Sequence, residues 1–167
     1  MKPIVLVSLL ALCLPLGTTA AQTKTFKGNM AGAAEVPAVS TAARGVFNAR
    51  ISDDGAAIHF QLAYTALEGD VLQAHIHLGQ RSVNGGVAAF LCSNLGTVGV
   101  QPCPAPPATI SGIITAADVI GPASQGIAAG EFAELVRAVR NGTAYANVHS
   151  SKFPGGEIRA QLDPGTP

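Results

Sequence analysis

Apolar and polar residues alternate in short runs along most of this chain. Ile58, Phe60 and Leu62, for example, share one face of an extended strand, and the residues between them are polar. Gly- and Pro-containing turns separate such runs at short intervals. The pattern predicts an all-β fold, an antiparallel immunoglobulin-like sandwich or barrel. Its strands are expected over Thr23–Met30, Arg44–Ser52, Ala57–Thr65, Val71–Leu78, Val87–Cys92, Ala108–Ile114, Thr143–His149 and Gly156–Leu162.

One segment, Ala129–Arg140, has helical rather than strand periodicity. Acidic residues occupy its first turn, basic residues occupy its last turn, and Asn141-Gly142 follows as a stop signal. Its apolar residues recur with the i, i+3, i+4, i+7 spacing of one helix face. The segment predicts a short amphipathic helix packed on one end of the β structure through Phe132, Leu135, Val136 and Val139.

The N-terminus has the features of a cleaved export signal over residues 1–21. Lys2 precedes an apolar run that is short for a membrane span, and small residues at 18–21 suit a signal peptidase. A lipid anchor on Cys13 is disfavoured, because Leu12 stands where a small residue is needed. One domain, residues 22–167, is then expected in the periplasm or outside the cell, with no later membrane span.

The balance of charged residues limits the classes of partner that the chain can bind. The chain has ten basic and ten acidic residues; without Lys2 the balance is nine against ten, a net charge of −1. This balance argues against nucleic acid as a partner.

Cys92 and Cys103 remain after removal of the signal, and an even count in an exported chain predicts one disulfide. Metal ligation by these thiolates is the competing interpretation.

Candidate chemistry lies in three histidines. His75 and His77 are separated by one residue in a predicted strand, so both imidazoles point to the same face. His149 shares a face with Tyr145 and Asn147 in another predicted strand. If these strands are neighbours, three nitrogen donors converge on the outer face of a sheet, where loops can shield them. Copper is the first choice for such a site and zinc the second.

Other polar residues are assigned supporting or solvated roles around this predicted site. The fourth ligand would be water or a carboxylate, and His59 is expected to be solvated. Candidates for hydrogen bonds that orient the imidazoles are Asn147, Gln73 and Glu157, and candidate carboxylate ligands are Glu35 and Glu157. Met30 is expected in the core.

The order of several short motifs resembles the CHRD domain family, which occurs in chordin and in exported bacterial proteins. The resemblance implies an immunoglobulin-like β fold and, in animals, an extracellular interaction module. The motifs are Gly32-Ala33-Ala34-Glu35-Val36-Pro37, Ala74-His75-Ile76-His77-Leu78-Gly79, Phe90-Leu91-Cys92-Ser93-Asn94, Gly130-Glu131-Phe132, Tyr145-Ala146-Asn147-Val148-His149 and Pro154-Gly155-Gly156-Glu157-Ile158-Arg159-Ala160-Gln161.

The histidine pattern is also similar to the copper site of copper-zinc superoxide dismutase. Here, however, only His59 is left over, so the bridging histidine and the zinc loop of that enzyme have no counterpart. We therefore predict an exported protein that binds one copper ion for binding, buffering or delivery, with a redox reaction as an extension. The alternatives are a metal-free module that binds another exported protein and a copper-dependent oxidoreductase; enzymatic activity is the less favoured of these interpretations.

Overall fold

The computed structural model describes residues 24–164, and the predicted export signal over 1–21 lies outside this range. Each of the eight predicted strands is present, with ends within two residues of those expected. They are β1 (Thr25–Ala31), β2 (Arg44–Ile51), β3 (Ile58–Thr65), β4 (Val71–Leu78), β5 (Val87–Ser93), β6 (Ala108–Ile114), β7 (Ala144–Ser150) and β8 (Ile158–Gln161). A two-residue strand, β9 (Asp163–Pro164), follows and pairs with β1.

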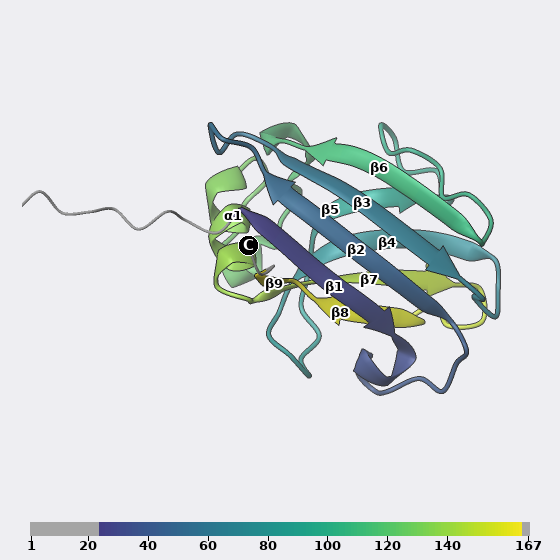
Figure 1. Ribbon diagram of the computed structural model, residues 1–167. Helices are drawn as coiled ribbons and strands as arrows, with labels where there is room; N and C mark the ends of the chain where they lie inside the picture. The colour runs from purple at the N-terminus through teal and green to yellow at the C-terminus, as the bar shows by residue number, and fades with distance from the viewer. Residues whose placement is uncertain (1–23, 165–167) are drawn as a thin grey trace, which may run out of the picture.

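The strands form one antiparallel sheet in the order β5-β4-β7-β8-β1-β2-β3-β6. The sheet curls into a nearly closed barrel, so that β5 lies behind β6 and the β1–β3 layer covers β4 and β7 (Figure 1). Gln101 joins the two edge strands, since its side-chain amide donates to the carbonyl oxygens of Leu91 and Ser111. The predicted all-β antiparallel class is therefore confirmed.

The inward side chains of each strand form the core, as the period-two pattern predicts. Phe47 from β2, Leu62 from β3 and Ile76 from β4 are each fully buried. Met30 is buried among them, whereas His59 is exposed on the outer face of β3, as expected for both residues. The Ser52–Ala57 turn joins β2 to β3 with Gly55 at φ +72°, a left-handed conformation that glycine adopts without strain.

Helix α1 (Phe132–Arg140) begins three residues later than the pattern indicated. It lies at one end of the barrel beside β9 (Figure 1), and its four predicted apolar residues are all buried. Three 3-10 turns complete the structure, at Gly32–Ala34, Ala116–Asp118 and Ala123–Gln125. Within residues 24–164 no helix is long and apolar enough to cross a membrane.

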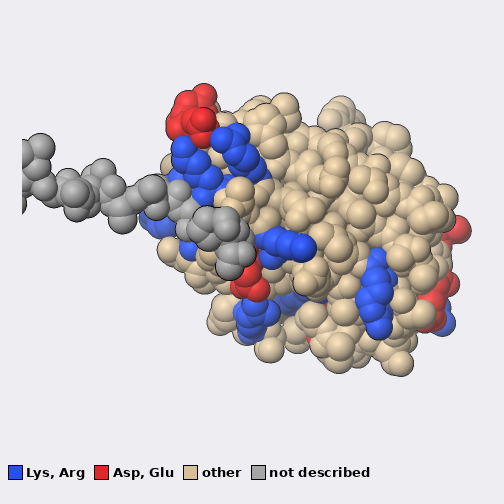
Figure 2. Space-filling view, viewed as in Figure 1, with Lys and Arg blue, Asp and Glu red and all other residues tan. Residues whose placement is uncertain are grey.

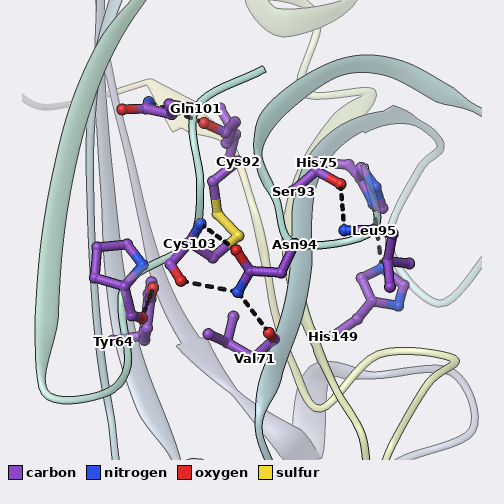
Figure 3. The surroundings of a disulfide bond; sticks show 12 residues. Tyr64, Val71, His75, Cys92, Ser93, Asn94, Leu95, Gln101, Cys103 and His149 are labelled. Atoms are coloured by element: carbon purple, nitrogen blue, oxygen red, sulfur yellow. Dashed lines mark hydrogen bonds between the residues drawn. A yellow bond between two sulfur atoms is a disulfide. The ribbon is translucent and has the colours of Figure 1, made fainter. Parts of the chain in front are cut away.

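Cys92 and Cys103 form the predicted disulfide, with both residues buried. Asn94 holds the loop that this disulfide closes. Its side-chain NH2 group donates to the carbonyl oxygens of Val71 and Cys103, and its side-chain oxygen accepts from the Cys103 backbone N–H, each at 2.9 Å (Figure 3). The loop between β5 and β6 is thus tied to the start of the histidine strand β4.

Charged residues are sparse on the face formed by β1, β2, β3 and β6 (Figure 2). At the β2–β3 turn, acidic and basic atoms lie together, and Asp53 pairs there with Lys24 and Arg50, each at 2.9 Å. No extended basic surface is seen on this face.

Candidate metal centre

Strand pairing brings the three histidines together. β4 and β7 are neighbours, with His75 opposite Asn147 and His77 opposite Tyr145, so His149 lies diagonally across from His75 on the same face. The opposite face carries Ala74 and Ile76, which are fully buried in the core. On the other side of β4, the pairing with β5 has register shifts before and after the His75-Ile76 pair, as β-bulges near functional sites often do.

The donor nitrogens of His75, His77 and His149 all lie within 4.8 Å of one another, and the three side chains are at most 8% exposed. The predicted convergence of these residues on the outer face of the sheet is confirmed. Every residue of β7 is buried, although the strand has one face toward the core and the other toward this cluster. Loops therefore cover the cluster.

Two backbone carbonyls fix the tautomers of His77 and His149. The Nδ1–H of His77 donates to the Gly85 carbonyl oxygen at 2.9 Å, and that of His149 donates to the Pro154 carbonyl oxygen at 2.8 Å. A carbonyl can only accept, so each neutral ring has its lone pair on Nε2. Carbonyl partners of this kind orient metal-binding imidazoles in proteins.

The two Nε2 lone pairs meet at one point. Oδ1 of Asn147 lies 3.1 Å from Nε2 of His77 and 3.1 Å from Nε2 of His149, and neither contact has a proton when the rings are neutral. A cation among these atoms would satisfy all three. Turning the Asn147 amide over, so that its NH2 group donates to both rings, satisfies the same nitrogens without a metal. Asn147 was predicted to orient the imidazoles, and it contacts two of them.

His75 completes the cluster through Nδ1, which donates to Nε2 of His149 at 3.2 Å (Figure 3). Its Nε2 is buried and has no hydrogen-bond partner within residues 24–164. Because a neutral imidazole carries one proton, moving it from Nδ1 to Nε2 would leave Nδ1 with a free lone pair directed toward the other two rings, where it could bind a metal ion. The Phe90 ring packs edge-on against His75, with ring centroids 4.7 Å apart.

Burial keeps the three imidazoles neutral. Desolvation lowers the pKa of His75 to about 3, and the neighbouring His149 and His77 add to the effect. Desolvation is also the largest cause of the lowered pKa of His77 and of His149. Neutral imidazole is the form that binds a metal ion, so protons compete little for these nitrogens at neutral pH.

Two side chains, Tyr145 and Arg159, stack in line with His77. The Tyr145 ring lies parallel to His77, with centroids 4.7 Å apart and planes 4° apart, and the Arg159 guanidinium lies 3.4 Å over the other face of Tyr145. Sequence reasoning did not single out Arg159, although its register opposite Asn147 places it on the histidine face. The pairing of β8 with β7 was the missing information.

The two carboxylates considered as ligands lie outside the cluster. Glu157 accepts hydrogen bonds from the Thr41 hydroxyl at 2.8 Å and from the Glu68 backbone N–H at 2.9 Å. Glu35 packs against Gly156, where an added Cβ would lie 2.6 Å from its Oε1. The group of donors within 4.8 Å consists of the three histidines. Gly156 therefore does more than form a turn: it makes room for Glu35.

The fold and the histidine face define an antiparallel β domain with a potential metal site. Residues 26–162 match the model of the CHRD domain, and the chain belongs to this family. Neither the curated proteins nor the solved structures contain a significant match to the chain.

Proposed function

We propose that this protein, exported by means of residues 1–21, binds one copper ion through His75, His77 and His149. The observation that carries the proposal is the convergence of three buried, neutral imidazoles, two of which have their lone pairs directed inward by backbone carbonyls. Two nitrogens bound at about 2.0 Å to one ion lie about 2.8–3.3 Å apart for angles of 90–110°. The 3.2 Å between Nδ1 of His75 and Nε2 of His149 is in this range.

The donor set supports copper over zinc. Three imidazoles suit either ion, and copper(II) binds nitrogen sites more tightly than zinc(II) in the general order of affinities. The disulfide removes both thiols at positions 92 and 103 from consideration as ligands. Bound copper would supply one-electron redox chemistry, which a zinc ion lacks.

The surroundings favour copper binding, buffering or delivery over catalysis on an organic substrate. Five hollows of about 150–560 Å³ on residues 24–164 are lined by other residues, and the histidines themselves are nearly enclosed. A substrate site beside a metal ordinarily needs a pocket that includes the metal ligands. A metal-free interaction module remains the alternative from a different class.

Metal titration of the mature protein tests this proposal. We expect one copper per chain by elemental analysis, and an electron paramagnetic resonance spectrum with nitrogen hyperfine structure. His75→Ala, His77→Ala and His149→Ala should each remove nitrogen coupling and weaken copper binding. His59→Ala is the matched control, because His59 is exposed on the opposite side of the hairpin from the core and is not in the cluster. Unchanged copper stoichiometry and spectrum in His75→Ala and His149→Ala would contradict the proposal.

A further inference from the structure

Arg159 is a buried cation, and no carboxylate within residues 24–164 lies close enough to it for an ion pair. It is 2% exposed, and the salt bridges of residues 24–164 do not include it. Its guanidinium donates to the carbonyl oxygens of Gln80 and Val83 at 3.1 and 2.9 Å, and to Oδ1 of Asn84 at 3.2 Å. Fully buried arginines are normally paired with an anion. Three neutral acceptors and the face of the Tyr145 ring stabilise this charge, but none of them carries a negative charge.

Glu35 lies near Arg159 with an unsatisfied oxygen. The residue is 7% exposed, and its Oε1 is buried without a hydrogen-bond partner in the described part of the chain. Burial raises the pKa of this carboxyl to about 7, although the charge of Arg159 acts in the opposite direction. A carboxyl group with this pKa can share a proton at neutral pH, and an orphaned oxygen needs a donor.

Both side chains border the same small polar pocket on the outer surface of the barrel. Its volume is about 150 Å³, which is room for about five non-hydrogen atoms at the roughly 30 Å³ that a water molecule occupies in the liquid. Arg81 contributes a second guanidinium at the rim, where it pairs with Asp163. The polar residues around the pocket are Glu35, Arg81, Ser82, Arg159 and Gln161.

We propose that this pocket binds a small oxyanion that carries its own proton, such as hydrogenphosphate or bicarbonate. Arg159, Arg81 and the Ser82 hydroxyl offer donors to the anion's oxygens, whereas Glu35 offers an acceptor for its O–H group. A fully deprotonated oxyanion of the same size would face repulsion from Glu35. The site thus selects for the proton on the ligand as well as for its negative charge.

The proposal rests on Arg159 and Glu35 and is independent of copper binding, so the metal-free protein is the right sample. Phosphate, bicarbonate and sulfate are titrated at pH 8 and constant ionic strength, with calorimetry for affinity and amide NMR shifts for location. At this pH Glu35, with a pKa of about 7, is mostly ionised, whereas hydrogenphosphate and bicarbonate keep their protons. We expect phosphate to bind at least about tenfold more tightly than sulfate, because sulfate has no proton for Glu35. The shifts should centre on residues 33–35, 81–82 and 159–161. Comparing phosphate with bicarbonate identifies which protonated oxyanion the pocket prefers.

Two variants keep the test independent of folding defects. Glu35→Gln replaces the acceptor by an amide that can donate, so sulfate should bind nearly as well as phosphate. Arg81→Gln, at an exposed position, should weaken the binding of all anions several-fold. Arg137→Gln is its matched control, because Arg137 is an exposed arginine of α1 outside the pocket lining. Equal affinity for sulfate and phosphate in the wild type, a preference that persists in Glu35→Gln, or no shift at millimolar anion would each overturn the proposal.

Discussion

Burial of three neutral imidazoles makes the stability of the metal-free protein depend on pH. His75 has a pKa of about 3 in the folded chain and about 6.5 in the unfolded chain. Between these values the unfolded chain binds a proton that the folded chain does not, so the free energy of unfolding falls as the pH falls. The free energy of unfolding is therefore unaffected by protonation of His75 above pH 6.5, and it falls progressively as the pH is lowered from 6.5 toward 3.

The size of the effect follows from the distance between the working pH and the unfolded pKa. At pH 4.5, two pH units below 6.5, His75 alone lowers the free energy of unfolding by about 2.7 kcal/mol relative to pH 7.5. His77 and His149, whose pKa values are also lowered, act in the same direction. Glu35 opposes them: its pKa rises from 4.5 to about 7, so the folded chain binds more protons in this window and gains stability as the pH falls.

Urea denaturation in the presence of a chelator, at pH 7.5 and pH 4.5, measures these contributions as differences. His75→Gln should reduce the acid-induced loss of stability by about 2.7 kcal/mol relative to wild type. Glu35→Gln should enlarge that loss by a similar amount, and His59→Gln serves as an exposed control. The same pH dependence in His75→Gln and wild type would refute the conclusion that His75 is buried as a neutral ring.

Three other measurements examine the site and its supports. Copper affinity, measured against a competing chelator, should change far less between pH 7.5 and pH 6 than the loss of about 50-fold expected for three imidazoles with unshifted pKa values; a loss of that size would contradict their burial. Gly156→Ala should cost about 1–3 kcal/mol in urea unfolding, because of its φ of +127° and its contact with Glu35, and should weaken copper binding through the Pro154 turn. Gly155→Ala is the control, since a Cβ there meets nothing within 4 Å; equal effects would refute this role of Gly156. Replacing Cys92 and Cys103 by alanine should lower the free energy of unfolding by about 3 kcal/mol, the value for a closed loop of this length; no change in the urea midpoint would contradict it.

Much of the fold could be predicted from local sequence. Alternation placed Phe60 and Leu62 inside and His59 outside, and helical spacing identified the buried face of α1. These patterns depend on residues a few positions apart, so the chain itself displays them. The helix start was wrong by three residues, because Ala129 to Glu131 form turns before the first helical residue. Helix ends depend on local backbone geometry that periodicity does not record.

The candidate site, too, could be predicted only in part from local sequence. The spacing of His75 and His77 determined that both rings share a face, and the motif at 145–149 determined the same for His149 and Asn147. Only the pairing of β4 with β7 decided that these faces meet. The carbonyls of Gly85 and Pro154 reach His77 and His149 because the loop after each strand folds back over it. Arg159 and Glu35 come from segments far apart in the chain. Such contacts depend on strand order and loop closure, which no local pattern encodes.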